Sequence, residues 1–467
     1  MELSNKKVVV VGLRLSGMAA AKLLREKGAS VWVTDSTSDA ELERSASALR
    51  TEGVQVELGA HTEEFISGSD LVVASPGVPR EALPIRWADE KSIPVISELE
   101  LAFNFCKAKS VIAITGTNGK TTVTTLIGEI IKEAGRECWV CGNIGEPFSS
   151  KVKDIGEGDI VVLEVSSFQL ERIKDFKPKI GIALNVTQDH LDRYSSMEEY
   201  SKAKLKLFQN QDGSDYAILN FDDSIAKGFA QKVRSKPLWY SIKRGVDEGA
   251  CIKGTHIVTI LDKKIMAISE RLNLRLLGEH NLENALASAL AAALLGIEAE
   301  TIAKVLGEFA GLAHRFEMVE SVGGIEFIDD SKATNVDSTM RALQACNKKV
   351  VLIAGGRDKA SDFRAARKII KEKVSSLVLI GEARERIAKA LDGHVPQVDF
   401  ADSMADAVKK AFSLAKRNYT VLLSPMCASF DMFKDYAERG KVFKEEVGKL
   451  KTSAPLDAPA AYVGEDK

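Results

Sequence analysis

The run TGTNGKTT, from Thr115 to Thr122, has the residue types of a phosphate-binding loop. It follows an apolar run that predicts a strand, and it opens a helical pattern. Glycines in such a turn let backbone N–H groups surround a phosphate, while the helix N-terminus and Lys120 supply positive charge. The hydroxyl of Thr121 is placed to hold Mg²⁺. The usual pattern has an earlier glycine where Ile114 or Thr115 stands, so a plain glycine turn is the alternative interpretation.

Three further residues in the same part of the chain could serve a metal or a phosphate. Glu164 ends the apolar run IVVL, where a metal-binding carboxylate beside a phosphate loop would lie; its alternative role is to cap the next helix. His190 follows the apolar run KIGIALN and is either a ligand or a structural histidine. Lys204, in EEYSKAKLKLF, by itself indicates only a solvated helix face.

A second glycine pattern joins Gly12 to Gly17, again between a predicted strand and a predicted helix. The dinucleotide-binding fingerprint requires glycine at position 14, where the backbone approaches a pyrophosphate closely, but Arg14 stands there. Asp35, at the end of the second predicted strand, could accept hydrogen bonds from a nucleoside. The pattern therefore favours a nucleotide-carrying substrate over NAD.

Polar runs follow three predicted strands in the last third of the chain. These runs are FIDDSKATN (327–335), AGGRDKASDF (354–363) and SPMCASFDMFKDYAERG (424–440). Ligands bind at the carboxyl ends of the strands in open parallel sheets. The last third is therefore predicted to have a binding edge of its own, with Asp329, Asp330 and Lys332 among its residues.

Short apolar runs alternate with helical patterns along most of the chain, as is typical of parallel strands covered on both faces. The predicted strands are 7–12, 30–35, 70–77, 110–116, 159–165, 179–185, 350–356, 376–381 and 420–425. Helical patterns such as 17–28, 121–135 and 284–296 join them into strand–helix–strand units. The predicted fold class is α/β. We expect three domains, 1–105, 106–311 and 312–451, and a disordered Pro/Ala-rich tail, 452–467.

The composition excludes several classes of protein. The 467 residues include 64 Lys and Arg against 66 Asp and Glu, which argues against nucleic-acid binding through a broad basic surface. The sequence has no apolar run long enough to span a membrane and opens directly on a predicted strand, so we expect a cytoplasmic protein without membrane insertion. Six scattered cysteines do not suit a disulfide framework. We interpret Cys138 and Cys141 as thiols at a strand end rather than a metal or redox pair.

Taken together and in order, the motifs resemble those of the Mur ligases, the amide-forming ligases of peptidoglycan synthesis. The motifs are TGTNGKTT, GNIG, EVSSFQLE, NVTQDHLDRY, YSKAK, GEHNLENALA, HRFE, DDSKATN, GGRDKASDF and SPMCASFD with a later RG. The first eight are typical of the wider family, and folylpolyglutamate synthetases share some of them. The last two resemble motifs of the member that adds D-glutamate.

The resemblance implies an ATP-dependent, ADP-forming ligase that adds D-glutamate to UDP-N-acetylmuramoyl-L-alanine through an acyl phosphate. It implies a Rossmann-like first domain, a central P-loop ATPase-like domain with a mostly parallel sheet, and a Rossmann-like third domain. The cofactors would be ATP as co-substrate, two Mg²⁺ ions and a carbamylated lysine, and we expect a monomer. Stabilising the charge of the transferring phosphoryl group would supply most of the catalysis.

The resemblance also assigns roles residue by residue. The catalytic residues would be Lys120, Glu164, His190 and Lys204. ATP would be bound by Gly116, Thr117, Asn118, Gly119, Lys120, Thr121, Thr122, Asn281, Arg315, Asp330 and Lys332. The UDP-linked substrate would contact Leu15, Ser16, Asp35, Ser36, Gly77, Asn143 and His190, and D-glutamate would contact Thr334, Lys359, Ser429, Phe430 and Tyr436. Thr121 and Glu164 would serve one Mg²⁺, and His190 and the carbamylated Lys204 the other.

Two other hypotheses stay open at this point. A different amide ligase of the family would add L-alanine, a diamino acid or folate glutamates, and the last two motifs argue against it. A nucleotide-binding regulatory module would keep the glycine loop but would have no use for Glu164, His190 and Lys204 together. The pyrophosphate contacts are also open, because Thr37 stands where some relatives carry arginine.

Overall fold

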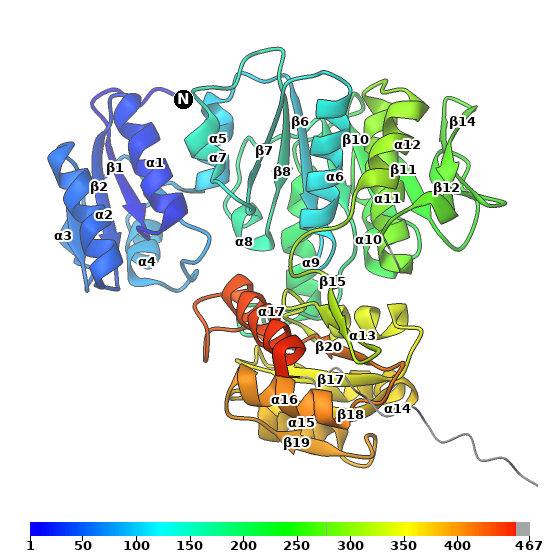
Figure 1. Ribbon diagram of the computed structural model, residues 1–467. Helices are drawn as coiled ribbons and strands as arrows, with labels where there is room; N and C mark the ends of the chain where they lie inside the picture. Colours follow the sequence, from blue (N-terminus) through cyan, green and yellow to red (C-terminus); the bar gives the residue numbers. More distant parts are fainter. Residues whose placement is uncertain (277, 454–467) are drawn as a thin grey trace, which may run out of the picture. The chain divides into compact units, whose positions relative to one another are not determined.

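The structure is a computed structural model that describes residues 1–276 and 278–453 (Figure 1). These residues form two compact units. The first comprises Met1–Thr187 and Arg193–Phe309, and the second comprises Gln188–Asp192 and the described residues from Ala310 onward. Three sheets, all rich in parallel pairs, confirm the predicted α/β class, and every strand named from the sequence is present.

The first sheet has five parallel strands in the order β3-β2-β1-β4-β5. Its strands are β1 (Lys7–Val11), β2 (Ser30–Asp35), β3 (Gln55–Leu58), β4 (Leu71–Ala74) and β5 (Val95–Ser97). Its helices are α1 (Leu15–Glu26), α2 (Ala40–Thr51), α3 (Glu63–Ile66), α4 (Leu83–Glu90) and α5 (Glu98–Phe105).

Alternate residues of β1 are buried on opposite faces of this sheet. Val8 and Val10 pack in one apolar cluster with Leu24 of α1, whereas Val9 belongs to a second cluster with Ile85 of α4. A strand covered by helices on both faces needs apolar residues at every position. This is why the run KVVVV shows no alternation of polar and apolar residues.

The second sheet has nine strands in the order β14-β13-β12-β11-β10-β9-β6-β8-β7. Its strands are β6 (Ser110–Thr115), β7 (Cys138–Gly142), β8 (Ile160–Glu164), β9 (Ile180–Ala183), β10 (Tyr216–Asn220), β11 (Lys236–Ser241), β12 (Gly249–Lys253), β13 (His256–Leu261) and β14 (Lys264–Glu270). The helices of this region are α6 (Lys120–Glu133), α7 (Phe148–Lys151), α8 (Ser167–Leu170), α9 (Met197–Leu205), α10 (Ser224–Gly228), α11 (Glu279–Leu294) and α12 (Ala299–Glu308). The strands from β7 to β12 pair in parallel, and β13 and β14 extend the sheet antiparallel.

The third sheet lies in the second unit and has six strands in the order β15-β16-β20-β17-β18-β19. Its strands are β15 (Glu317–Val322), β16 (Ile325–Asp329), β17 (Val350–Gly355), β18 (Val374–Ile380), β19 (Val398–Phe400) and β20 (Thr420–Leu423). Its helices are α13 (Val336–Ala345), α14 (Arg367–Lys373), α15 (Arg384–Leu391), α16 (Met404–Leu414) and α17 (Tyr436–Ser453). Only the pair β15–β16 is antiparallel.

The first two sheets belong to one unit, and contacts of α5 connect them. Glu100 of α5 is almost fully buried, and its carboxylate accepts hydrogen bonds from the backbone N–H groups of Lys174, Asp175 and Phe176 at 2.8–2.9 Å. A single apolar cluster also runs from Val8 of the first sheet to Ala113 of the second. The boundaries at 105/106 and 311/312 stay predictions.

Three remaining expectations concern the two cysteines of the C-x-x-C pair, membrane-spanning helices and the tail at the end of the chain. Cys138 and Cys141 both lie on β7 and contribute to apolar clusters on opposite faces of the sheet, so their sulfurs do not form a redox pair. Among the described residues, no helix is both long and apolar enough to cross a membrane. Helix α17 ends at Ser453 and so includes the first two residues of the predicted tail 452–467. The rest of that tail lies outside the described residues.

Candidate active site

The glycine loop joins β6 to α6, and its lysine folds back over it. Lys120 is the first residue of α6, and its Nζ donates to the carbonyl oxygens of Gly116 at 2.9 Å and Thr117 at 2.8 Å. Gly119 precedes the helix with φ +85°, a conformation that favours glycine. The loop thus places an ammonium group and the N-terminus of a 14-residue helix at one point, which is the arrangement that binds a phosphate.

Two asparagines that the sequence interpretation missed lie at this loop, and one of them is hydrogen-bonded to it. The Oδ1 of Asn185 accepts from the backbone N of Asn118 at 2.8 Å, and its Nδ2 donates to the Asn118 carbonyl at 3.1 Å. Asn284 of α11 lies against Gly119, and its Nδ2 donates to Oδ1 of Asn281 at 3.3 Å. Asn185 opens the motif NVTQDHLDRY and Asn284 lies in GEHNLENALA, so the motifs contained both signals.

Glu164 is the last residue of β8, and its register partner on β6 is Ile114, next to the loop. It is 4% exposed, and its Oε1 accepts from Nδ2 of Asn143 at 2.9 Å. Helix α8 is capped instead by the side chain of Ser166. The interpretation of Glu164 as a helix cap is therefore wrong.

Lys204 is buried, so the solvated helix face that its own sequence context indicates is also wrong. The side chain on α9 is 1% exposed, and its Nζ donates to the carbonyl oxygen of Gly116 at 2.8 Å. Nζ also lies 4.4 Å from the centre of the Tyr200 ring. Its neighbour Lys202 is exposed and pairs with Glu198 at 2.7 Å. Two ammonium groups, from Lys120 and Lys204, therefore meet at one loop carbonyl.

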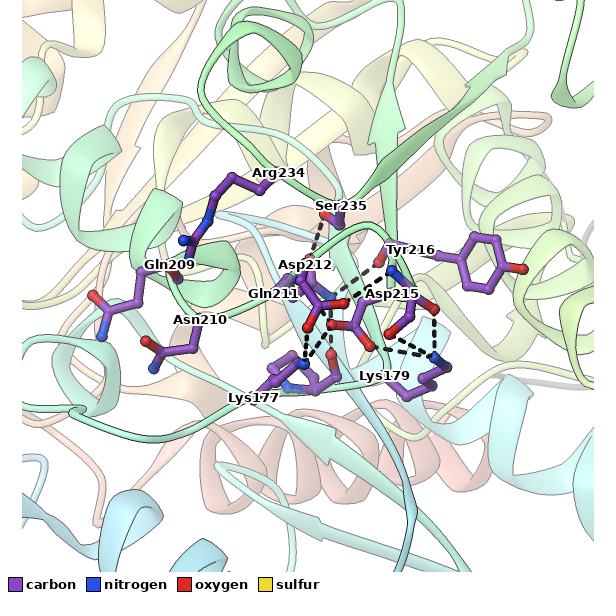
Figure 2. A network of polar contacts seen from close by, with 12 residues as sticks. Lys177, Lys179, Gln209, Asn210, Gln211, Asp212, Asp215, Tyr216, Arg234 and Ser235 are labelled. Atoms are coloured by element: carbon purple, nitrogen blue, oxygen red, sulfur yellow. Dashed lines mark hydrogen bonds and ion pairs between the residues drawn. The ribbon is translucent and has the colours of Figure 1, made fainter.

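A polar network fixes the chain just beyond α9 (Figure 2). Gln211 is fully buried; its Nε2 donates to the carbonyl oxygens of Pro178 at 2.9 Å and Tyr216 at 3.1 Å. Its Oε1 accepts from Oγ of Ser235 at 2.7 Å. Lys177 pairs with Asp212 at 2.5 Å. These contacts tie the segment after α9 to the starts of β9 and β10.

The second glycine pattern has a structural reason. A Cβ at Gly17 would collide with the carbonyl oxygen of Gly12, so only glycine lets α1 start so close to the end of β1. Asp35 accepts from the backbone N of Leu13 at 2.8 Å and of Thr37 at 2.9 Å. Asp35 therefore shapes this loop and still has acceptor positions for a nucleoside.

The other residues predicted for the UDP-linked substrate lie at the carboxyl ends of their strands. Leu15 is 75% exposed and Ser16 half-buried at the start of α1, and Ser36 is exposed after β2. Gly77 is exposed after β4, and Asn143 is exposed after β7. All five belong to the first unit.

His190 lies in the segment Gln188–Asp192, which belongs to the second unit. It has φ +55°, and its backbone N donates to Oδ1 of Asp189 at 2.9 Å. Asp189, which sequence reasoning missed, also accepts from Nδ2 of Asn335 at 3.1 Å and lies 3.6 Å from Nζ of Lys359. The structure thus brings the predicted residues His190 and Lys359 to one carboxylate.

Residues predicted for ATP and for D-glutamate meet elsewhere in the second unit. Nζ of Lys332 lies 3.6 Å from the ring centre of Tyr436. Thr334, half-buried, donates its backbone N–H to the Lys332 carbonyl at 2.8 Å. After β20, Ser429 is buried and Phe430 is 63% exposed.

Asp330 follows β16, and the pKa of its carboxyl group is shifted from its usual value. Burial raises the pKa of Asp330 to about 7, although hydrogen bonds from Ser424 Oγ and the Phe316 backbone and the charge of Arg315 act in the opposite direction. Oδ2 of the adjacent Asp329 lies 2.6 Å from Nδ1 of His314. That histidine precedes Arg315 in the motif HRFE, and the sequence interpretation gave it no role.

Family models match three parts of the chain. They are described as "Mur ligase MurD-like, N-terminal domain" over residues 6–97, "Mur ligase middle domain" over 114–292 and "Mur ligase, glutamate ligase domain" over 314–427. Together these matches span the three sheets.

Relatives and solved structures agree with these matches. The UDP-N-acetylmuramoylalanine–D-glutamate ligase of Pelotomaculum thermopropionicum is 44% identical, over 96% of this chain and 99% of its own. The enzyme of that name from Alkaliphilus metalliredigens is 42% identical, over 97% and 100%. The solved structure of UDP-N-acetylmuramate–alanine ligase MurC from Thermotoga maritima has the same fold, with a TM-score of 0.60 and 21% identity over 95% of this chain and 100% of that one.

The three sheets and the loop that carries Lys120 define the class of α/β proteins in which a glycine loop and a lysine open the helix after a central strand. The family models and the full-length relatives go further than this class. The chain belongs to the Mur ligase family.

Proposed function

We propose that this chain is the ligase that joins D-glutamate to UDP-N-acetylmuramoyl-L-alanine and converts ATP to ADP and phosphate, a step of peptidoglycan precursor synthesis. Full-length relatives above 40% identity are named UDP-N-acetylmuramoylalanine–D-glutamate ligase. The structural observation that supports it best is the convergence of Lys120 and Lys204 on the Gly116 carbonyl. Lys120 is cationic and stands at the N-terminus of α6, which suits the transfer of a phosphoryl group whose charge must be stabilised.

The proposed reaction has two steps. The carboxylate of the alanyl substrate attacks the γ-phosphorus of ATP, giving an acyl phosphate and ADP. The amine of D-glutamate then attacks the acyl carbon, and phosphate leaves as the amide forms. Lys120, with the N–H groups of residues 116–122, would hold the phosphates. Asn281 would contact adenine, Asp330 the ribose, and Arg315 and Lys332 the phosphate end.

Hard oxygen donors, which Mg²⁺ prefers, are available beside this loop. The Thr121 hydroxyl lies in the first turn of α6, and the buried Glu164 carboxylate ends the strand next to β6, so this pair fits one ion. Bound Mg²⁺ would neutralise charge on the transferring phosphoryl group. We propose His190 and Lys204 for a second ion. Because an ammonium group has no lone pair, Lys204 would serve as its carbamate.

The remaining substrates are proposed to bind at the strand ends described above. The UDP-linked substrate would contact Leu15, Ser16, Asp35, Ser36, Gly77, Asn143 and His190. D-Glutamate would contact Thr334, Lys359, Ser429, Phe430 and Tyr436. The ammonium group of Lys359 and the hydroxyl of Ser429 are donors for its two carboxylates.

Phosphate release from ATP in the presence of UDP-N-acetylmuramoyl-L-alanine tests this function. We expect release with D-glutamate and at least about a hundredfold less with L-glutamate, L-alanine or lysine. Lys120→Ala should abolish the release without unfolding the protein, and Lys132→Ala, an exposed lysine of the same helix, should not. Equal rates with L-alanine or lysine, or a fully active Lys120→Ala variant, would contradict the proposal.

A further inference from the structure

A buried carboxylate ties several segments of the first unit together. The side chain of Glu171, which follows α8, is 4% exposed. It accepts from Nη2 of Arg193 at 2.8 Å and from the hydroxyl of Tyr194 at 2.7 Å, and Nε of Arg80 lies 3.0 Å from its Oε2. Burial acts to raise the pKa of Glu171, but these donors hold it below its usual value. The carboxylate therefore stays charged and contacts all three of these side chains.

Arg80 connects this carboxylate to the loop between β4 and α4. It lies three residues after Gly77 in that loop, and its Nη1 also donates to Oε1 of Glu199 on α9 at 2.5 Å. Nη1 of Arg193 reaches the carbonyl oxygen of Pro76 in the same loop at 3.5 Å. Two arginines therefore hold the loop of Gly77 against the elements of the second sheet.

The same set of contacts continues to the glycine loop. The ring of Tyr194 lies 5.5 Å from the guanidinium carbon of Arg80 and 5.2 Å from the ring of Tyr200. The hydroxyl of Tyr200 is 3.3 Å from Oγ1 of Thr117, and its ring lies under Nζ of Lys204. A contiguous series of side chains thus runs from Arg80 to the loop that carries Lys120.

We propose that Arg80 is a positioning residue, which holds the loop of Gly77 at a set place relative to the glycine loop through Glu171 and Glu199. This inference rests on the proposed function, because Gly77 is assigned there to the UDP-linked substrate. A loop that is already held loses less conformational freedom when the substrate binds, so the substrate binds more tightly. Correct alignment of the two loops also favours attack on ATP.

The structure offers a matched control for this role. A cavity of about 390 Å³ is lined by Arg80, Lys202 and Lys206 among others. Lys202 carries the same charge at the same cavity, but its partner Glu198 is exposed and belongs to the same helix. Substituting Lys202 therefore removes a charge from the cavity without releasing the loop of Gly77.

The test compares Arg80→Ala, Arg80→Lys and Lys202→Ala by calorimetric binding of UDP-N-acetylmuramoyl-L-alanine and by steady-state kinetics. We expect Arg80→Ala to raise the Kd and the KM for the UDP-linked substrate about tenfold and to lower kcat. The KM for D-glutamate and the affinity for ATP alone should change less than twofold. Arg80→Lys should recover part of the loss, and Lys202→Ala should match the wild type.

Each outcome decides one claim. If the wild-type protein fails to bind the UDP-linked substrate, the proposed function falls, and this inference falls with it. If the wild type binds it and Arg80→Ala has the wild-type Kd and KM, only the positioning role is overturned. If Arg80→Ala does not fold, Glu199→Gln replaces it. This variant weakens the same contact and should raise the Kd severalfold, and an unchanged Kd would overturn the inference.

Discussion

The chemistry of Lys204 depends on whether its nitrogen carries a positive charge. As an ammonium group it repels a metal ion, but reaction of the neutral amine with CO₂ forms a carbamate with two oxygens and releases a proton. The remaining N–H of the carbamate can still donate to the Gly116 carbonyl, as Nζ does in the structure. Complete burial beside the glycine loop is therefore compatible with either form of Lys204.

We predict that Lys204→Ala lowers kcat at least about a hundredfold, because it removes the proposed ligand of one Mg²⁺. Short carboxylates such as acetate should restore part of the activity by supplying the missing oxygens. Lys202→Ala, on the same helix, is the control and should stay fully active. Extra density beyond Nζ of Lys204 in a crystal structure would support the carbamate. A fully active Lys204→Ala variant would refute it.

Lys359 should decide affinity for D-glutamate. Its Nζ is 3.6 Å from Asp189, and its side chain is 21% exposed, so the ammonium group is accessible to a further carboxylate. Lys359→Ala should raise the KM for D-glutamate at least about tenfold and the other two KM values far less, since it removes the charge-assisted hydrogen bond proposed for this substrate. Steady-state kinetics measure this. Lys441→Ala, an exposed lysine of α17, is the control, and equal changes in all three KM values would instead indicate general destabilisation.

Asp330 should make the stability of the protein depend on pH. Its pKa is raised to about 7, against about 4 in an unfolded chain, so between these values the folded protein keeps a proton that the unfolded chain has released. The free energy of unfolding should therefore fall as the pH rises from about 4 to about 7. The Asp330→Asn variant has no carboxyl group at this position, so it lacks this pH dependence. Urea unfolding should show this variant gaining at least ~1 kcal/mol on the wild type between pH 5 and pH 7.5. An identical difference at both pH values would count against the raised pKa.

At the scale of elements, the glycine loop depends on how closely α6 and α11 pack. The helices share one apolar cluster through residues such as Ile127 and Leu286. A Cβ at Gly119 would lie 2.5 Å from Oδ1 of Asn284, so the loop has no room for a side chain at that position. The two helices thus set the conformation of the loop as much as its glycines do.

We predict that Gly119→Ala lowers kcat/KM for ATP more than about tenfold, because the loop must move away from Asn284. Gly135→Ala is a matched control at the other end of α6. It also has positive φ, +69°, but a Cβ there meets nothing within 4 Å. It should cost ~1 kcal/mol of stability and leave the kinetics within twofold. Similar kinetics for both variants would show that backbone strain, and not the contact with Asn284, matters.

At the scale of the whole molecule, the residues proposed for ATP are divided between the two units. Lys120 and Asn281 belong to the first unit, and Asp330 and Lys332 to the second. Because one ligand has to engage residues of both units, we expect binding to make the protein more compact.

Small-angle scattering should show a smaller radius of gyration when the UDP-linked substrate and a non-hydrolysable ATP analogue are added with Mg²⁺. Lys332→Ala, which removes a proposed ATP contact of the second unit, should reduce this change. A radius of gyration that is unchanged at saturation would contradict the prediction.

The features that the sequence by itself determined are those that depend on neighbouring residues. The runs KVVVV and SVIAIT are strands because continuous β-branched residues suit a sheet covered on both faces, and the structure has them as β1 and β6. The motifs from TGTNGKTT to SPMCASFD also placed the chain in its family, because each of them needs residue types at set spacings. The antiparallel extension by β13 and β14 was not predicted, although two-residue turns join β12 to β13 and β13 to β14, so the signal for these hairpins was local and was missed.

Only the tertiary structure decided the environment of individual side chains. Lys202, Lys204 and Lys206 have the same type and spacing in the sequence, yet Lys202 is exposed and Lys204 is buried. The carbonyl that receives Nζ of Lys204 belongs to Gly116, 88 positions earlier in the chain. Glu164 likewise has Asn143 as its partner rather than the helix that follows it. Burial and hydrogen-bond partners depend on segments that meet only when the chain has folded, and no local pattern contains that information.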